Sequence, residues 1–244
     1  RTAIENAEEA VYEEKKMEEM EVCFLMDRFG YMKLIDKNAY ERNKEAVHNE
    51  NKYVFNCMNT DKICIFTDTG KMHTIKAVDI PLGRFRDKGT PVDNLSNYDS
   101  SQERMLYVAP VGQLRSDRLL FVTKTSMCKL VEGAEFDVAK RTIASTKLAD
   151  EDELIFIGSA SEMEQIVLQS HGGCFLRFLT QEVSTMKKTA LGVRGMKLAD
   201  DDYLEHAYLL AGHQEYTISY HDKEYALNKV RLAKRDTKGI KPRI

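Results

Sequence analysis

One pattern recurs along this chain: an alternating apolar strand, a tight turn that usually holds glycine, and a second alternating strand that carries a basic residue. Apolar residues with a period of two on both sides of a turn are typical of a β-hairpin. The clearest copies are residues 24–35, 65–76, 120–131 and 167–178, and a fainter copy spans 216–229. Each copy is therefore predicted to form one hairpin.

The spacing of the hairpins predicts how they are assembled. Successive turns lie 40, 56 and 47 residues apart, at Gly30, Gly70, Ser126 and Gly173, and a fifth is expected near Asp222. Such a period is found in proteins built from four-stranded blades arranged radially. A lone hairpin cannot bury its apolar face, but several packed side by side can. The repeat predicts an all-β, propeller-like array.

Length and composition favour one repeat domain over two small ones. The chain has 244 residues, 43% of them apolar, which is ample for one large all-β domain. We expect this domain over 21–244, after an acidic helix or linker over 1–20. No run approaches the ~18 to 20 apolar residues of a membrane span, and the start lacks the pattern of a signal peptide. The chain is thus expected to be soluble and cytoplasmic.

Metal and catalytic signatures are missing from the sequence. The five cysteines include no CxxC pair and the six histidines no HExxH spacing, so we predict no metal site and buried, structural cysteines. Carboxylates cluster at 150–153 and 200–202, where turns are expected, and there they are more typical of solvated or capping groups than of an acid/base site. We therefore assign no catalytic residue.

The net charge of −3 conceals an uneven distribution, with −5 over residues 1–21 and +6 over the last sixteen. Basic residues recur in the segments between strands of every proposed blade. Duplex DNA offers regularly spaced phosphates, so a rim that binds it needs cations at equivalent points of successive blades. The candidates are Arg42, Lys44, Arg84, Arg86, Lys88, Lys140, Arg141, Lys187, Lys188, Arg194, Lys234, Arg235 and Lys238. Solvated loops that bind nothing are the alternative.

A second set of basic residues follows the hairpin turns directly. It comprises Lys33, His73, Lys129 and Arg177. We expect these side chains to form a second ring on the same edge of the array. Contacts of this kind fix the position of DNA without reading bases, so little sequence preference is expected.

The connecting segments after the hairpins carry a family resemblance. The most specific is ALGVRGMKLADDD (190–202), followed by KGTPVDNL (88–95). In order and content, hairpins and connectors over 21–244 resemble the C-terminal domain of the A subunit of bacterial DNA gyrase and topoisomerase IV. The resemblance implies a β-pinwheel, a disc of four-stranded blades in which a strand from one blade completes its neighbour, with an outer rim that binds and bends duplex DNA.

The resemblance also implies what this domain leaves to other parts of the enzyme. The catalytic tyrosine belongs to the family's N-terminal portion, so no strand cleavage is expected here, and no cofactor is expected, since ATP and magnesium are used elsewhere in the holoenzyme. The implied partners are double-stranded DNA and, in a heterotetramer, the ATPase B subunit together with the remainder of the A subunit. A membrane is not among them.

One departure bears on the choice within the family. Gyrase A subunits carry a basic, glycine-rich box close to QRRGGKG after the first hairpin, whereas the matching stretch here (38–54) has Arg42, Lys44 and Lys52 and no glycine. This favours a topoisomerase IV type protein, which captures DNA for relaxation and decatenation. A gyrase with a degenerate box and a propeller used as a protein-interaction scaffold remain alternatives. Five hairpins predict five blades where the family commonly has six, and the disc is either open or closed.

Overall fold

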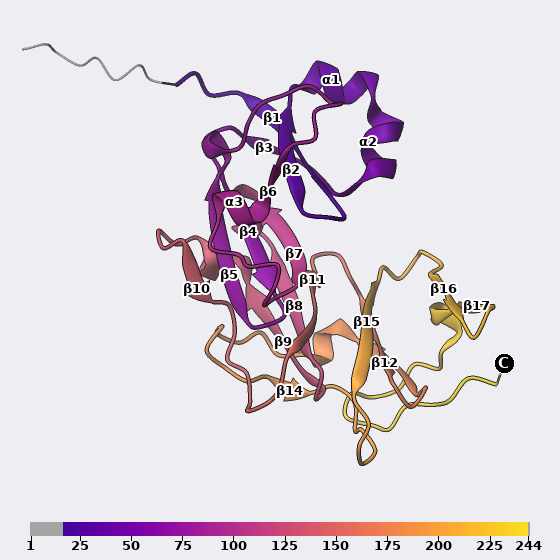
Figure 1. Cartoon of the computed structure of the whole chain (residues 1–244). Helices are drawn as coiled ribbons and strands as arrows, with labels where there is room; N and C mark the ends of the chain where they lie inside the picture. The colour runs from indigo at the N-terminus through magenta and orange to yellow at the C-terminus, as the bar shows by residue number, and fades with distance from the viewer. Residues whose placement is uncertain (1–16, 244) are drawn as a thin grey trace, which may run out of the picture.

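The computed structural model describes residues 17–243, and they form five antiparallel sheets that follow one another along an arc (Figure 1). The first sheet lies at one end of the arc and the fifth at the other. The all-β, propeller-like prediction is confirmed, with five hairpins in five blades. No helix among the described residues is long and apolar enough to cross a membrane. The predicted acidic helix falls mostly on residues 1–16, outside the described residues, and Met17 to Met20 form no helix.

Each sheet is built around one of the predicted hairpins. In order these are β1 (Glu21–Asp27) with β2 (Tyr31–Ile35), β4 (Lys62–Thr67) with β5 (Lys71–Lys76), β8 (Arg118–Thr123) with β9 (Met127–Glu132), β12 (Gln165–Ser170) with β13 (Phe175–Leu179), and β16 (Thr217–Tyr220) with β17 (Lys223–Ala226). Gly30, Gly70 and Gly173 turn the chain with positive φ, and Ser126 does so at φ 73°. In the fifth hairpin His221 and Asp222 make the turn.

A third strand lies against the first strand of each of the first four hairpins. These outer strands are β3 (Asn51–Met58), β7 (Met105–Pro110), β11 (Leu154–Ser159) and β15 (Leu204–Leu210). Their pairing is antiparallel and carries a register shift near the hairpin turn. Bulges of this kind bend and twist a strand locally, as a radial array of blades requires.

The fourth strand of a blade comes from the next blade along the chain. These exchanged strands are β6 (Thr90–Pro91), β10 (Thr142–Ala144) and β14 (Val193–Arg194), and they pair with β2, β5 and β9. In the fourth blade a single bridge from Ile240 to Phe175 takes this place. The strand exchange implied by the family resemblance is thus confirmed. Three sheets have four strands, whereas the fourth has three and the fifth only two.

Helices are short and mark the connections. A 3-10 helix follows the second hairpin strand in blades two to five: η1 (Ala77–Asp79), η2 (Gly133–Phe136), η3 (Thr180–Glu182) and η4 (Leu227–Lys229). The first blade has α1 (Lys37–Arg42) and α2 (Lys44–Glu50) at this point instead. The other helices among residues 17–243 are two single-turn helices, α3 (Val92–Leu95) and α4 (Val111–Leu114).

The core lies between successive sheets. Phe66 of β4, Phe121 of β8 and Phe136 of η2 are buried together, with the ring centroids of Phe66 and Phe136 4.9 Å apart in an edge-to-face arrangement. Full burial of such a side chain contributes about 1.5–3 kcal/mol. Because each inner sheet has a neighbour on both faces, β8 and β9 are buried on both faces rather than on alternate residues.

Candidate nucleic-acid interface

Four segments cross from one blade to the preceding one, and we call them connectors. Each begins after a 3-10 helix and ends with the exchanged strand or bridge: the first spans 80–91, the second 137–144, the third 183–194 and the fourth 230–240. The first, third and fourth begin alike, with a parallel bridge to the second strand of the preceding hairpin, at Leu82, Thr185 and Leu232. Equivalent positions of successive blades thus carry equivalent segments.

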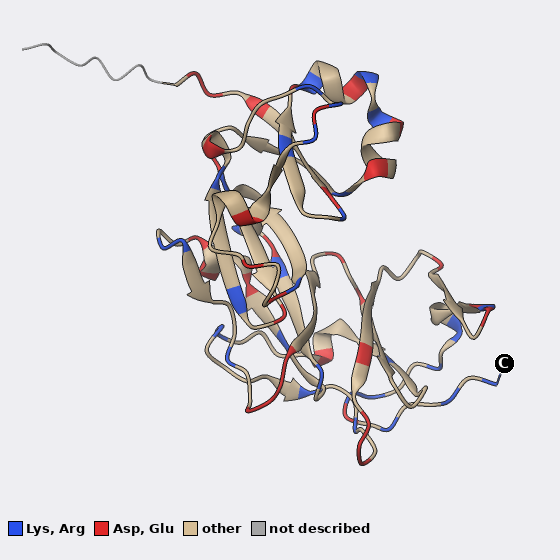
Figure 2. Ribbon diagram, in the orientation of Figure 1, with Lys and Arg blue, Asp and Glu red and all other residues tan. Residues whose placement is uncertain are grey.

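The connectors concentrate positive charge. Their 43 residues hold 12 of the 36 Lys and Arg side chains but only three of the 39 carboxylates. The connectors together carry +9, which leaves −12 on the rest of the chain. Figure 2 shows the basic residues recurring along these segments from the first blade to the last. A ligand with many regularly spaced negative charges would find its counter-charges here.

The three carboxylates on the connectors are all held by neighbouring cations. Asp87 lies 3.5 Å from Arg84, and Asp236 pairs with Arg194. Asp137 accepts from Lys62 and Arg115, each at 2.9 Å, and these hydrogen bonds hold its pKa below the usual range. The acidic groups therefore do little to repel an anion from the connectors.

Glycine allows the connectors to approach the preceding blade closely. Gly89, Gly192 and Gly239 have φ values of 83°, 108° and 72°, and each comes just before or inside the exchanged segment. A Cβ at any of them would lie 2.6 Å from a carbonyl oxygen of the preceding hairpin. Only glycine tolerates both this backbone conformation and this contact. These glycines fix where each connector rejoins the sheet.

Most predicted site residues on the connectors are exposed: Arg84, Arg86, Lys88, Lys140, Arg141, Lys187, Arg194, Lys234 and Lys238. Lys188 and Arg235 are partly buried. Lys188 Nζ donates to the Glu135 carbonyl at 3.2 Å, and Arg235 Nη1 donates to the Arg194 carbonyl at 2.6 Å. The structure brings these eleven residues onto one repeated segment. Arg231, which is exposed on the fourth connector, was missed, although it lies only three residues before Lys234.

The basic side chains after the hairpin turns were expected to form a second ring of exposed cations. The structure does not place them on the surface in this way. Lys129 is only 2% exposed and His73 likewise, while Lys33 and Arg177 are partly buried. Lys129 Nζ donates to the carbonyls of Lys188 (2.8 Å) and Ala190 (2.6 Å). The next blade's connector covers this face of the strand, so these side chains point into a packed junction rather than to solvent.

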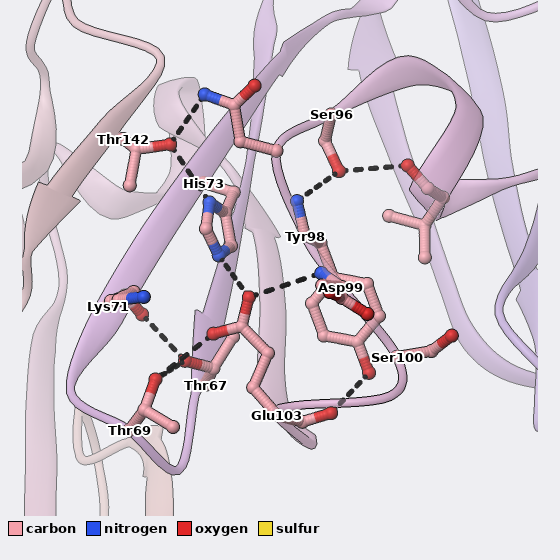
Figure 3. A network of polar contacts seen from close by, with 12 residues as sticks. Thr67, Thr69, Lys71, His73, Ser96, Tyr98, Asp99, Ser100, Glu103 and Thr142 are labelled. Carbon is pink, nitrogen blue, oxygen red and sulfur yellow. Dashed lines mark hydrogen bonds and ion pairs between the residues drawn. The ribbon is translucent and has the colours of Figure 1, made fainter.

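In the second blade the equivalent position holds a histidine in a buried polar network (Figure 3). His73 Nε2 lies 2.6 Å from Oε1 of Glu103, and His73 Nδ1 lies 3.0 Å from the Thr142 hydroxyl on β10. Thr69 donates to the other oxygen of Glu103 at 3.0 Å. Burial raises the pKa of Glu103, but hydrogen bonds from Thr67 and His73 outweigh it, and the pKa lies below its usual value. This network ties the second connector to β5.

Acidic residues gather in a different place, the turns that lead into the outer strands. The acidic turns, 99–103, 149–153 and 199–202, hold nine carboxylates and no Lys or Arg. Backbone hydrogen bonds place them beside the hairpin turns of adjacent blades: Leu154 donates to the Asp68 carbonyl, and Lys124 donates to the Glu153 carbonyl. The carboxylates at 150–153 and 200–202 therefore lie in turns, as predicted. Among the described residues no group of three or more Asp, Glu, His or Cys could hold a metal ion.

The cysteines are structural groups in the part of the chain that the structure describes. Cys23, Cys57, Cys64 and Cys128 are buried and Cys174 is partly buried, all as free thiols. Burial raises the pKa of Cys128 to about 12, so its thiol stays protonated and unreactive at neutral pH. The prediction of buried cysteines is confirmed for four of the five.

Comparison with known proteins assigns this arrangement to a family. The family described as "DNA gyrase C-terminal domain, beta-propeller" matches residues 61–100, 117–161 and 164–211, more than half of the chain. The chain belongs to this family. The DNA gyrase A protein of Ureaplasma parvum is 25% identical over 236 residues, covering 90% of this chain and 28% of its own length. The chain thus spans less than a third of that relative.

Two solved structures show the same fold. The C-terminal domain of DNA topoisomerase IV superposes with a TM-score of 0.80 at 22% identity, covering 92% of this chain and 73% of that one. A DNA gyrase A C-terminal domain superposes with a TM-score of 0.60 at 18% identity, covering 91% of this chain and 76% of that one. These likenesses show the fold, in which the blades are those of a β-pinwheel. With the family match, the chain is a C-terminal domain of a type IIA topoisomerase A subunit.

In the first blade of this gyrase-family domain, two short helices stand where an inter-strand loop was expected. The stretch that matches the glycine-rich box forms α1, α2 and the start of β3. Asp36 caps α1 by accepting from Ala39 N at 2.8 Å, and the helix ends at Asn43. Arg42 and Lys44 are exposed but lie on these helices, not on an inter-strand loop, which corrects their expected setting. The sequence itself contains signals for this helix: Asp36 is a favoured residue at a helix N-cap, and Ala39 favours the interior of a helix.

Proposed function

We propose that this domain binds duplex DNA along its connectors and bends it around the arc of blades. The observation that carries the proposal is the +9 charge on four equivalent segments of a chain that is otherwise −12. Phosphate contacts release condensed counterions and need no particular base sequence. The separation of basic connectors from acidic turns directs DNA to the connectors and away from the turns.

The proposed contacts are the exposed connector cations, together with Arg42 and Lys44 on the helices of the first blade. In the third connector, 82% of the Lys187 side chain is exposed. Arg194 is 53% exposed and keeps Asp236 as its partner, so it contributes less free charge. Lys33, Lys129 and Arg177 are not among the proposed contacts, because their side chains point into the blade junctions.

The test is fluorescence anisotropy of a labelled duplex of about 40 base pairs at several salt concentrations. We expect affinity to fall linearly with salt on a double-logarithmic plot. The triple variant Lys187→Ala, Lys188→Ala, Arg194→Ala should bind more weakly, with a salt slope lower by about 1 to 3. The matched control replaces three cations beside the hairpin turns, Lys71, Arg104 and Lys124, and makes the same change in net charge.

The two triple variants separate local contacts from net charge. Equal losses in both would show that overall charge, not the connectors, governs binding. Full affinity of a folded connector variant would remove the third connector from the interface. No binding by the wild-type domain at low salt would favour a protein-interaction scaffold.

We further propose that the parent protein is of the topoisomerase IV type. It would act with the remainder of its own chain and an ATPase B subunit in the bacterial cytoplasm, relaxing and decatenating DNA by presenting the transferred segment for strand passage. Support comes from α1 and α2, which stand where a gyrase has its glycine-rich box, and from the higher TM-score to topoisomerase IV. The sequence relatives named gyrase keep the gyrase alternative open.

Ligation of a nicked plasmid in the presence of the domain tests this choice. A domain that wraps DNA tightly leaves a changed linking number after ligation. We expect binding with little change in linking number for the topoisomerase IV type. A large change, proportional to the amount of bound domain, would instead assign the chain to gyrase.

A further inference from the structure

A buried lysine, Lys129, and a partly buried one, Lys33, lie at the same point of two blades. Lys33 and Lys129 each come three residues after the residue that turns the hairpin, Gly30 and Ser126. In the register of the sheets they face Leu25 and Phe121 on the first hairpin strand. The repeat therefore places one ammonium group under the first connector and one under the third.

Each ammonium binds the backbone of the connector above it. Lys129 Nζ lies 2.8 Å from the carbonyl oxygen of Lys188 and 2.6 Å from that of Ala190. Lys33 Nζ donates to the carbonyls of Phe85 and Asp87, the latter at 2.6 Å. Both connectors thus curl around a cation, with two carbonyls two residues apart pointing inward in each.

This geometry sets where the side chains point. With the carbonyls of residues 85 and 87 turned toward Lys33, the side chains of Arg84, Arg86 and Lys88 are all exposed. In the third connector Lys187 is 82% exposed next to the inward carbonyl of Lys188. Buried carbonyls without a donor are costly, so removing the ammonium favours a different connector conformation in which water reaches them.

We propose that Lys33 and Lys129 are positioning residues of the DNA-binding surface: each ammonium holds its connector in the conformation that presents the connector's cations to phosphates. This proposal rests on the proposed function. Lys129 itself does not reach a phosphate in this arrangement, since it is only 2% exposed. DNA affinity then depends on a cation inside the protein.

The surroundings of Lys129 support a charged group that is held in place. Burial lowers its pKa to about 8, an effect opposed by Glu135, so the ammonium form still predominates at neutral pH. Its Nζ also lies 5.7 Å from the centre of the Phe121 ring. Glu135 in turn accepts from the backbone N of Lys188 at 3.1 Å. The cation and this carboxylate thus fix the same connector residue from two sides.

The experiment compares Lys129→Met, Lys129→Arg and the surface control Lys71→Met by DNA anisotropy at low salt. Methionine matches the unbranched apolar stem of lysine as far as Cε but has no ammonium. We expect Lys129→Met to weaken binding by about 3- to 10-fold, arginine to restore part of the loss, and Lys71→Met to change affinity by less than about 2-fold. Trypsin cleavage after Lys187 and Lys188 in the folded protein should be faster in Lys129→Met alone.

A double-mutant cycle distinguishes positioning from a general loss of stability. In a Lys187→Ala, Lys188→Ala, Arg194→Ala background, Lys129→Met should cause no further loss of affinity, because the cations that it positions are gone. If the triple variant binds DNA normally, the proposed function fails for this blade. If the triple variant binds weakly but Lys129→Met binds normally, the positioning role fails and the proposed function stands.

The first connector keeps the proposal testable if Lys129→Met does not fold. Lys33→Met removes the equivalent ammonium at a site that is less deeply buried, and Arg84→Ala, Arg86→Ala, Lys88→Ala is its surface counterpart. In this triple-variant background too, Lys33→Met should cause no further loss of affinity. Additive losses in both connectors would overturn the proposal.

Discussion

The second and third connectors occupy the same place in neighbouring blades but are held in different ways. The third is long, has Gly192 at a close approach and curls around the Lys129 ammonium. The second is shorter, has no such glycine, and is held through Thr142 by the His73 and Glu103 network. A different polar contact from the second hairpin strand thus holds the connector in each of the two blades. Because one connector is held by an ammonium and the other by a histidine and a carboxylate, their contributions to stability should respond differently to mutation and to pH.

The largest effect is expected at the close approach in the third connector. In Gly192→Ala a Cβ would lie 2.6 Å from the Cys128 carbonyl oxygen, at a φ of 108° that alanine avoids. We expect the free energy of unfolding to fall by about 2–4 kcal/mol, measured by urea denaturation. The control is Gly83→Ala, whose Cβ would meet only the flexible Asp87 carboxylate at 2.9 Å. Similar losses at both positions would refute the role of the close approach.

The second connector should be most sensitive at Glu103. Glu103→Ala leaves His73 and Thr69 without their acceptor in a buried site, and we expect a loss of about 2–3 kcal/mol. The counterpart in the third blade is Glu135→Ala. Glu135 pairs with the exposed Lys187 at 3.5 Å and accepts from the backbone N of Lys188 at 3.1 Å. Water can replace it at both donors more easily than at the buried His73, so a smaller loss of about 1 kcal/mol is expected there. If Glu135 proved the costlier of the two, the contrast between the connectors would be reversed.

These contrasts mark the limit of what the sequence predicts. Period-two patterns and turn residues were enough for the five hairpins and the repeat, since both are local signals. The burial of Lys129 was not predictable from alternation, because β9 is covered on both faces once the next blade's connector lies over it. His73 and Glu103 are thirty residues apart, and no spacing rule links them. The exposed connector cations were found because loops between strands are the usual place for them.

The pH dependence of stability should also differ between the two connectors. Hydrogen bonds place the pKa of Glu103 in the folded protein below its ordinary value of 4.5. The unfolded chain therefore takes up this proton first as pH falls. Stability from Glu103 is complete above pH 4.5 and is lost as pH falls through the folded-state pKa. The difference in unfolding free energy between wild type and Glu103→Ala should shrink as pH falls below 4.5, which denaturation at several pH values measures. A constant difference would contradict this assignment.

The smallest effect concerns DNA binding by the two connectors. Lys140→Ala, Arg141→Ala in the second connector removes two exposed cations, as Lys187→Ala, Lys188→Ala removes two cations in the third. Arg141 also donates to the Leu95 carbonyl at 3.1 Å, and Lys188 to the Glu135 carbonyl, so one cation of each pair is tethered to a backbone carbonyl. If DNA follows the arc across both blades, each pair should lower affinity less than about tenfold and reduce the salt slope equally, by about 1 to 2. If only one of the two double variants lowered affinity and salt slope, the bound duplex would pass over that blade alone. The proposal that DNA bends along the arc would then lack support.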